Sequence, residues 1–254
     1  MKISVITPSY NQAAFIETTI NSVLSQKGDV DLELIVVDGG STDGTIDILK
    51  KYSSDITWVS EKDRGQADAV NKGINMSSGE IIGWLNSDDI YLDNTLRTII
   101  EYFKSNKNCQ WLFGKCKIID CDGKDARSLN TRYKDYHLLR YKFRKLLIEN
   151  FISQPAVFFR RSLIDKVGLL NINYNYAMDY DLWLRFGRES KPCIINEYLS
   201  AFRQHNESKS ETAYDKQFKE EFKIAKKYTN SLTIKALHWL NVRKILIAYN
   251  LMKK

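Results

Sequence analysis

The apolar residues at the start of the chain alternate between short β-type runs and segments with helical spacing. Residues 3–7 are short, apolar and β-branched, which predicts a buried strand. We expect Asn11 to cap the helix that follows, because apolar residues then recur at helical spacing from Phe15 to Leu24. A strand followed by an amphipathic helix is the repeating unit of α/β folds.

The same alternation continues through the first hundred residues. We expect further strands over 32–37, 56–59 and 80–85. We expect helices through 46–49, over 67–76 and over 94–103. Repeated strand–helix–strand units predict an α/β fold with a Rossmann-like, mostly parallel central sheet and helices on both faces.

Polar segments follow four successive predicted strands. They are TPSYNQ at 7–12, DGGSTDG at 38–44, EKDRGQ at 61–66 and NSDD at 86–89. The carboxyl ends of parallel strands meet at one edge of the sheet, where ligands bind. One polar loop is ordinary, but four at one edge, which together hold five aspartates, indicate a functional site.

Composition and charge exclude several classes of protein. At 254 residues and 43% hydrophobic content the chain can bury a large core, so a disordered or fibrous protein is excluded. No secretion signal is visible at the start, and no apolar run approaches the ~18 residues of a membrane-spanning helix. We therefore expect a cytoplasmic protein, soluble or peripheral on the inner face of the cell membrane.

The net charge of +7 is concentrated in two places. Residues 132–148 and residues 230–254 each carry +5, which leaves 7 − 5 − 5 = −3 for the rest of the chain, including the polar loops. Two local patches favour a local contact over a general nucleic-acid surface, and no nucleic-acid motif is present. We expect no nucleic-acid partner.

The four cysteines, at 109, 116, 121 and 193, lack paired C-x-x-C spacing. That spacing argues against a zinc ribbon or a redox dithiol. We expect reduced thiols.

Asn86, Ser87, Asp88 and Asp89 follow the apolar strand 81–85. Adjacent carboxylates repel each other unless a cation offsets them, and their oxygens suit Mg²⁺ or Mn²⁺. The alternative is that one aspartate caps the next helix. We favour the metal.

Asp38 ends another buried strand before two glycines, where it either binds a ribose or simply shapes a turn.

Five motifs together resemble glycosyltransferase family 2, whose members have the GT-A fold. They are TPSYNQ, VVDGGSTDGT, DRGQADAVNKGIN, GEIIGWLNSDD and AMDYDLWLR, in this order, and the resemblance covers residues 1–206. It implies a GT-A domain over 1–206, with a nucleotide-sugar-binding half at 1–104 and an acceptor and catalytic half at 105–206. A C-terminal helical extension would span 207–254.

The resemblance also assigns roles to residues. Contacts to the nucleotide sugar, a UDP-sugar in this interpretation, fall to Thr7, Pro8, Tyr10, Asp38, Asp63, Arg64, Gln66, Asn86 and Ser87. Tyr10 would stack on the base and Arg64 would meet phosphate, although Arg64 is equally suited to a surface ion pair with Asp63 or Glu61. Gln154, before Pro155, would lie near the acceptor.

The resemblance also implies a divalent metal, Mn²⁺ or Mg²⁺. Asp88 matches the family's principal ligand, with Asp89 and His205 as further candidates, His205 being equally suited to a solvated loop. The first acidic position of the family's D-x-D is Asn86 here, which removes one negative charge.

Asp179 matches the family's catalytic base at the start of a helix, and Met178 replaces the glutamate that usually precedes it. A carboxylate there can accept the proton of an attacking hydroxyl. The alternative for Asp179 and Asp181 is a purely structural role at a helix N-terminus. We favour the base for Asp179 and the structural role for Asp181.

Residues 136–149 have the spacing of a basic amphipathic helix, which either rests on an anionic membrane or packs on its own domain. Residues 232–252 are basic and aliphatic without a clean polar face. A membrane contact, a dimer contact and simple packing all fit this second segment, and the oligomeric state is left open.

These expectations converge on an inverting glycosyltransferase. It would move a sugar from a nucleotide-diphosphate donor to a hydroxyl of a saccharide or lipid-linked oligosaccharide, in the synthesis of surface polysaccharide. The alternative is a non-catalytic nucleotide-sugar-binding or scaffold protein, in which Asn86 and Met178 have disabled the chemistry.

Overall fold

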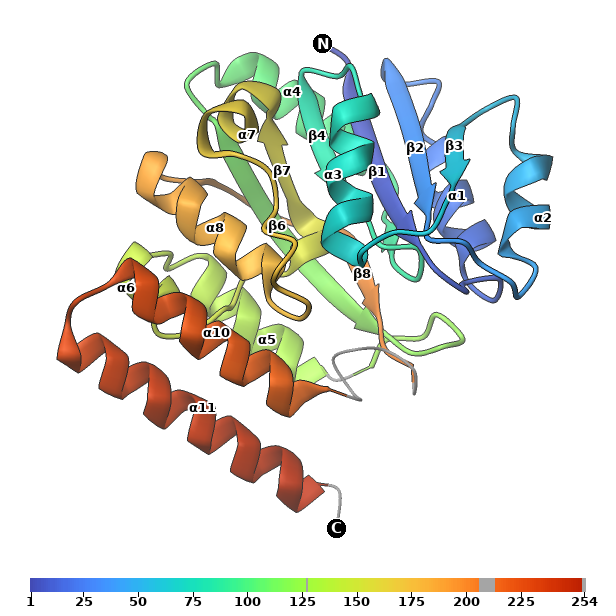
Figure 1. Cartoon of the computed structure of the whole chain (residues 1–254). Coiled ribbons are helices and arrows are strands. Elements are labelled where there is room, and N and C mark those ends of the chain that lie inside the picture. The colour runs from blue at the N-terminus through green and yellow to red at the C-terminus, as the bar shows by residue number, and fades with distance from the viewer. Residues whose placement is uncertain (127, 206–212, 253–254) are drawn as a thin grey trace.

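The computed structural model describes residues 1–126, 128–205 and 213–252. An eight-stranded sheet at its centre has the order β3-β2-β1-β4-β7-β6-β8-β5 (Figure 1). The strands are β1 (Ile3–Ser9), β2 (Leu32–Asp38), β3 (Thr57–Ser60), β4 (Ile81–Trp84), β5 (Ile90–Tyr91), β6 (Trp111–Ile119), β7 (Val157–Arg160) and β8 (Cys193–Arg203).

Most of the sheet runs in one direction, as the sequence predicts. β3, β2, β1 and β4 form parallel pairs, and β6 pairs in parallel with β8. β7 runs antiparallel to both β4 and β6, so the group β3, β2, β1 and β4 points in the same direction as the pair β6 and β8. The short β5 is antiparallel to β8. The α/β fold class is confirmed, with β7 and β5 as reversals that no pattern in the sequence announces.

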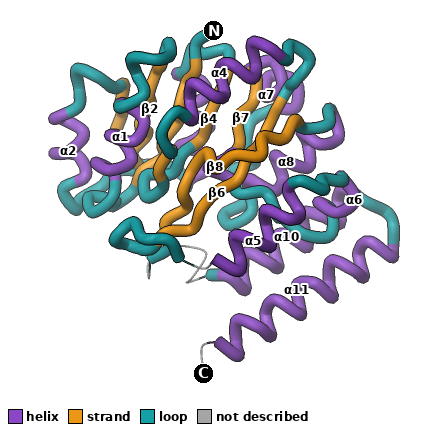
Figure 2. The backbone as a smooth tube through the Cα atoms, turned by 180° about the vertical axis from the view of Figure 1, so that it is seen from behind, coloured by secondary structure: helices purple, strands orange, loops and turns teal. Residues whose placement is uncertain are grey.

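Helices cover both faces of the sheet (Figure 2). α1 (Ile16–Leu24), α2 (Thr45–Lys51) and α4 (Thr95–Ser105) pack on one face; α3 (Gln66–Met76), α7 (Arg161–Val167) and α8 (Met178–Glu189) pack on the other. Period-two alternation in β1 produces this arrangement, because Val5 faces the first group and Ile6 the second.

The start of α1 differs from the prediction. Asn11 does not cap it: the helix begins at Ile16, and Asn11 has a left-handed backbone with φ 52°. The Asn11 side chain instead accepts a hydrogen bond from the Thr42 amide at 2.9 Å. Asn11 therefore joins two loops, and residues 12–15 form a turn before the helix.

The predicted basic helix over 136–149 is wrong in its extent. α5 (Ser128–Leu138) ends early, and the short α6 (Phe143–Leu146) follows a turn. The break lets Tyr141 pack on Trp111 in the core, with ring centroids 6.3 Å apart and nearly perpendicular planes. The packing of Tyr141 on Trp111 therefore stabilises this region more than a helix continued from α5 would.

The cysteines also differ from the prediction. Cys109, two residues before β6, and Cys193, the first residue of β8, form a disulfide with Cα atoms 6.2 Å apart. Cys116 is a buried free thiol and Cys121 an exposed one. The expectation of four reduced thiols is wrong for the first pair.

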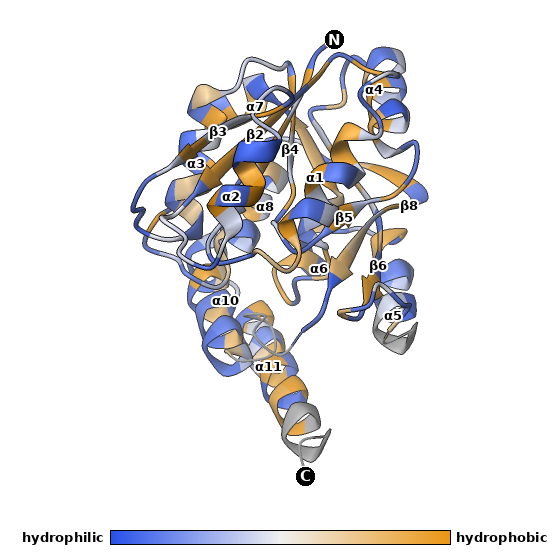
Figure 3. Ribbon diagram, turned by 90° about the vertical axis from the view of Figure 1, so that its right-hand side faces the viewer, coloured by the Kyte–Doolittle hydropathy of each residue, from blue (hydrophilic) through white to orange (hydrophobic). Residues whose placement is uncertain are grey.

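The C-terminal helices α10 (Tyr214–Tyr228) and α11 (Leu232–Met252) stack at the end of the molecule opposite the N-terminus (Figure 1). Figure 3 shows apolar and polar residues interleaved along α11. Its outer surface exposes Leu232, Trp239, Leu240 and Ile247, with Arg243 over the Trp239 ring. None of the helices in the described ranges is long and apolar enough to cross a membrane. Peripheral membrane contact and cytoplasmic localisation stay predictions.

Gly83 in β4 shows how tightly the sheet packs beneath the site. A Cβ atom there would lie 2.6 Å from the Tyr91 hydroxyl oxygen and 2.9 Å from the buried Phe158 ring. We expect Gly83→Ala to lower the free energy of unfolding by about 1–3 kcal/mol, because the core would have to shift. Urea denaturation measures this. Gly28→Ala is the control, since nothing lies within 4 Å of a Cβ at that position; equal stability of the two variants would contradict the prediction.

Candidate functional site

A cavity of about 1230 Å³ lies at the carboxyl ends of β1, β2, β3 and β4 and extends to the C-terminal helices. It brings together most of the residues that the sequence singles out: Pro8, Tyr10, Asp63, Gln66, Asn86, Ser87, Asp88, Asp179 and His205. Four others do not line it, namely Thr7, Asp38, Arg64 and Asp89. The predicted gathering of the loops at one edge is thus observed.

Thr7 and Asp38 lie beneath the cavity floor. Thr7 is fully buried within β1. The Asp38 carboxylate, also fully buried, accepts hydrogen bonds from the Gly40 and Ser41 amides at 2.9 and 2.8 Å and from the Ser60 hydroxyl at 2.7 Å. In this structure Asp38 shapes the loop after β2, and a contact with a nucleoside stays a prediction.

Tyr10 stands at the cavity rim with 62% of its surface exposed. The loop that carries it is tied to the loop after β2: the Asn11 amide donates to the Ser41 hydroxyl at 2.7 Å, and the Gln12 amide to the Thr45 hydroxyl at 2.9 Å. An exposed aromatic ring on an anchored loop is suited to stacking on a planar base.

The loop after β3 divides into two parts. Asp63 faces the cavity and accepts a hydrogen bond from the Gly65 amide at 2.8 Å, and its carboxylate lies so close to Gly39 that a Cβ there would be 2.7 Å away. Arg64 points elsewhere and pairs with Asp68 at 3.1 Å. Arg64 therefore forms a surface ion pair, as the sequence allows, but its partner is Asp68. Phosphate binding by Arg64 stays a prediction.

Asn86 makes four side-chain hydrogen bonds within the site. Its Oδ1 accepts hydrogen bonds from Gln66 Nε2 at 2.7 Å and Trp84 Nε1 at 2.9 Å. Its Nδ2 donates to Gln154 Oε1 at 3.0 Å and Asp89 Oδ2 at 3.3 Å. Gln154, which the sequence places near the acceptor, thus lines the same cavity in contact with the predicted donor side.

Asp88 and His205 form the strongest candidate for binding a cation. His205 Nε2 lies 3.1 Å from Asp88 Oδ2, and both side chains line the cavity. The His205 ring packs against Phe15 with centroids 4.7 Å apart, which fixes its orientation. Within the described residues, no group of three or more acidic, histidine or cysteine side chains surrounds a single point. A metal here would therefore take its remaining ligands from a bound diphosphate and water.

Asp89 differs from Asp88 although the two are neighbours. It is fully buried, and its Oδ1 accepts a hydrogen bond from the Arg203 amide of β8 at 2.9 Å. Burial and the adjacent charge of Asp88 raise the pKa of Asp89 well above its ordinary value. These contacts hold the loop to β8, and the metal role predicted for Asp89 stays untested.

Asp179 lies in the first turn of α8 and lines the cavity. Burial raises the pKa of Asp179 to about 6. Backbone hydrogen bonds, the charge of Lys134 and a hydrogen bond from Asn150 lower the pKa and so oppose part of this shift. Asp181 has the structural role that the sequence favours: it is buried and accepts hydrogen bonds from Arg185 at 3.0 Å and the Tyr228 hydroxyl at 2.8 Å.

The C-terminal helices supply residues that sequence reasoning missed. Glu221 of α10 and His238 of α11 line the cavity and are almost completely buried. Burial raises the pKa of Glu221 to about 8, with the charge of Asp179 adding to the shift and Gln217 opposing it. The only signal in the sequence was an acidic residue and a histidine on otherwise ordinary helices.

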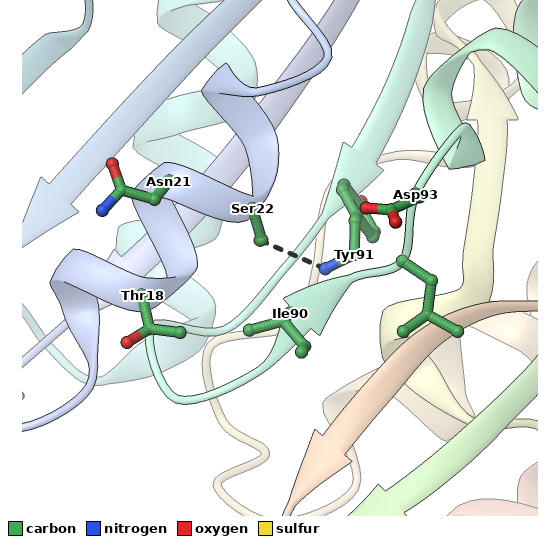
Figure 4. A pocket seen from close by; sticks show the side chains of 7 residues that line it. Thr18, Asn21, Ser22, Ile90, Tyr91 and Asp93 are labelled. Carbon is green, nitrogen blue, oxygen red and sulfur yellow. Dashed lines mark hydrogen bonds between the residues drawn. The ribbon is translucent and has the colours of Figure 1, made fainter.

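A second hollow, between α1 and β5, is lined by none of the predicted site residues. Figure 4 shows that Ser22 and Tyr91 meet at its floor, where the Tyr91 amide donates to the Ser22 hydroxyl at 3.2 Å. This contact ties α1 to β5, and the hollow holds only one charged side chain, Asp93.

Comparison with known families decides the class of the protein. Residues 4–168 match the model of the family described as Glycosyl transferase family 2. The chain belongs to glycosyl transferase family 2. The match ends before α8, so it leaves Asp179 and the C-terminal helices outside the matched segment.

Relatives of this glycosyltransferase occur in several bacteria. An uncharacterized glycosyltransferase of Rickettsia typhi is 31% identical over 219 residues, which are 83% of this chain and 66% of the relative. A PGL/p-HBAD biosynthesis glycosyltransferase of Mycobacterium tuberculosis is 28% identical over 223 residues, covering 85% and 81% of the two chains. The chain thus spans slightly less than two thirds of the rickettsial relative.

Two solved structures share the fold. S. aureus TarS, residues 1–349, in complex with UDP-GlcNAc has a TM-score of 0.71 at 20% identity, covering 89% of this chain and 65% of that one. The mannosyltransferase PcManGT from Pyrobaculum calidifontis, in complex with GDP-Man and Mn²⁺, has a TM-score of 0.69 at 20% identity, covering 94% and 68%. The GT-A fold expected from the motifs is therefore confirmed.

The raised pKa of Asp179 gives the folded state a specific pH dependence. Between the ordinary pKa of about 4 and the raised pKa of about 6, the folded protein holds a proton that the unfolded chain releases. As the pH rises through that interval, this carboxyl therefore lowers the free energy of unfolding. We expect Asp179→Asn to gain stability relative to the parent between pH 4 and 6 and to keep that gain above pH 6. Urea denaturation at several pH values measures it, and a pH-independent difference would contradict the prediction.

Proposed function

We propose that this family 2 glycosyltransferase moves a sugar from a nucleoside-diphosphate donor, a UDP-sugar, to a hydroxyl group of an acceptor, with inversion at the anomeric carbon. The observation that carries the proposal is one cavity with two different acidic centres. Asp88 pairs with His205 on the side of the donor loops, and Asp179 lies at the start of α8.

The donor side suits a nucleotide sugar. Tyr10 offers an aromatic face for the base, and Asp63 and Gln66 offer polar contacts around it. The solved structures of TarS and PcManGT, which share the fold, contain UDP-GlcNAc and GDP-Man, respectively. This likeness supports a nucleoside-diphosphate sugar as donor and leaves its base and sugar to experiment.

Asp179 is suited to act as the general base. With a pKa of about 6, it is largely ionised at neutral pH yet more basic than an exposed aspartate. In the proposed reaction Asp179 takes the proton of the acceptor hydroxyl as that oxygen bonds to the anomeric carbon. The bond from that carbon to the diphosphate oxygen breaks at the same time, and the nucleoside diphosphate leaves.

Asp88 and His205 are the residues that would hold a divalent cation. A carboxylate and an imidazole 3.1 Å apart fit Mn²⁺ better than Mg²⁺, because Mg²⁺ prefers an all-oxygen shell. When bound, the cation would offset the charge that develops on the departing diphosphate. The Mn²⁺ in the PcManGT complex supports this choice.

The acceptor in this proposal is a saccharide or lipid-linked oligosaccharide used in surface polysaccharide synthesis. The mycobacterial relative, a PGL/p-HBAD biosynthesis glycosyltransferase, acts in a biosynthetic pathway, which is compatible with this choice of acceptor. The rival is a non-catalytic nucleotide-sugar-binding protein. It predicts donor binding without turnover, so one assay separates the two.

We expect the purified protein to release nucleotide from one member of a nucleotide-sugar panel when Mn²⁺ is present. Asp179→Asn should lower that rate by about 100-fold or more, because a general base contributes 10²–10⁴. Asp165→Asn, an exposed aspartate on α7, is the matched control. Tight donor binding with no release under any condition would favour the binding protein, and full activity in Asp179→Asn would reject the base.

We expect Asp88→Asn to weaken Mn²⁺ binding by about tenfold or more, because the carboxylate is the only anionic ligand that this pair offers. Electron paramagnetic resonance titration of Mn²⁺ with UDP present measures this without relying on turnover. Asp93→Asn is the control, since Asp93 is exposed and lies outside the cavity. Unchanged Mn²⁺ affinity in Asp88→Asn would reject the assignment.

A further inference from the structure

Helix α11 is apolar on two opposite sides. One side packs on the rest of the protein, where Ile234 and Val242 are buried. The other side exposes Leu232, Leu240 and Ile247. A helix that is apolar on all sides is normally buried on all sides. In the described part of the chain, however, the protein covers only one side of α11.

The exposed side forms a continuous stripe, the outer face of α11. It consists of Leu232, Ala236, Leu240, Arg243 and Ile247, and Trp239 borders it. Successive members of the stripe are three or four residues apart, so they lie along one side of the helix. Leu232 is 80% exposed and Ile247 59%. Figure 1 shows α11 as the outermost helix at its end of the molecule. Apolar patches of this kind mark surfaces that bind a partner.

The charges on this helix are all positive. Lys235, Arg243 and Lys244 are the charged residues between positions 232 and 247, and the stretch contains no acid. The Arg243 guanidinium lies over the Trp239 ring, 5.0 Å from its centroid. An apolar stripe that carries cations and no acid is complementary to an anionic surface with an apolar layer beneath it.

Helix α10 adds to this positive charge. It packs against α11 through Phe222, whose ring centroid lies 5.3 Å from that of His238. The exposed residues of α10 include Lys216, Lys223 and Lys226, whose spacing of seven and three residues places them on one side of that helix. Long-range attraction to an anionic surface therefore sums over both C-terminal helices.

A second copy of the chain fits the outer face less well than a lipid surface does. In a two-fold contact the same patch meets itself, so Arg243 would face apolar residues or like charges. Burying an arginine without an acidic partner is costly. At a bilayer surface, its aliphatic stem lies along apolar groups while the guanidinium stays among the phosphates. Trp239 suits the same depth, because tryptophan is enriched at membrane interfaces.

We propose that the outer face of α11 binds the surface of an anionic lipid bilayer, with the helix axis parallel to the membrane. Leu232, Leu240 and Ile247 enter the boundary between headgroups and acyl chains, and the cations of both helices face the lipid phosphates. This inference goes beyond the proposed function, because binding to lipid needs neither donor nor acceptor.

Membrane binding in this orientation would bring the cavity close to lipid. Asn241, Lys244 and Ile245 of α11 line the cavity, and Lys244 is also exposed. The cavity therefore reaches the helix that meets the membrane. A lipid-linked acceptor held in the same bilayer would be near Asp179. This consequence, unlike the binding itself, rests on the proposed function.

Flotation of the purified full-length protein with vesicles tests the proposal. We expect binding to vesicles of phosphatidylcholine mixed with phosphatidylglycerol, and weaker binding at higher salt or to phosphatidylcholine alone. The double variant Leu240→Gln/Ile247→Gln should lower the partition coefficient about tenfold or more, because two apolar side chains lose their burial. Arg243→Gln should lower it about fivefold on the anionic vesicles, the effect of one charge near the surface.

Two matched controls lie away from the C-terminal helices. Leu169→Gln replaces an exposed leucine between α7 and α8, and Lys51→Gln removes an exposed charge on α2. Both should bind vesicles like the wild type, and thermal unfolding checks the fold of each variant. The proposal is overturned if the wild type does not bind anionic vesicles, or if Leu240→Gln/Ile247→Gln binds them equally well.

Light scattering examines the rival occupant of the face. A wild-type dimer that Leu240→Gln/Ile247→Gln dissociates, together with no binding to vesicles, would identify a second copy and overturn the proposal. The flotation assay contains no nucleotide sugar, so its outcome is independent of whether the protein transfers a sugar.

Discussion

The amide of Asn86 joins the two sides of the cavity, and the arrangement of the site depends on it. Its oxygen accepts a hydrogen bond from Gln66 at the start of α3, and its nitrogen donates one to Gln154, which precedes β7. An amide can do both, whereas an ionised carboxylate has no hydrogen to donate. An aspartate at this position would also face Asp89, which is fully buried 3.3 Å away. The departure from the family's D-x-D is therefore consistent with an intact site, in which the neutral side chain avoids a second buried charge.

Neighbouring residues of like chemistry acquire different roles through burial. Asp88 reaches the cavity, while Asp89 faces the Arg203 amide under the loop. On α8, Asp179 lines the cavity, while Asp181 pairs with Arg185 on another side of the helix. In each pair one residue lines the cavity, and its neighbour makes hydrogen bonds that hold the loop or the helix in place. Sequence motifs name both members of each pair, and only the fold distinguishes them.

The first hundred residues could be predicted because strand and helix periods are regular there. The strand exits at Tyr10, Asp63 and Asn86 could be placed on one edge by topology alone. Several features lack such a signal. The reversal of β7 follows from its pairing with β4 and β6, and the break between α5 and α6 follows from the burial of Tyr141 against Trp111. Arg64 pairs with Asp68, and the spacing in the sequence cannot show which of several nearby carboxylates becomes its partner. Each of these depends on contacts between residues far apart in the chain or on competition among near neighbours.

The C-terminal helices show why the boundary of a family motif is a poor guide to the boundary of a site. Viewed as a sequence, residues after 206 read as an extension. In the structure, Glu220 caps the helix that carries Asp179, and the charge of Asp179 in turn raises the pKa of Glu221. The burial that raises the pKa of Asp179 makes its ionised form unfavourable for the stability of the fold. A cap that accepts three backbone hydrogen bonds helps to offset that cost at the same helix end. Helix α10 therefore lines the cavity and also supports the first turn of α8, where Asp179 lies.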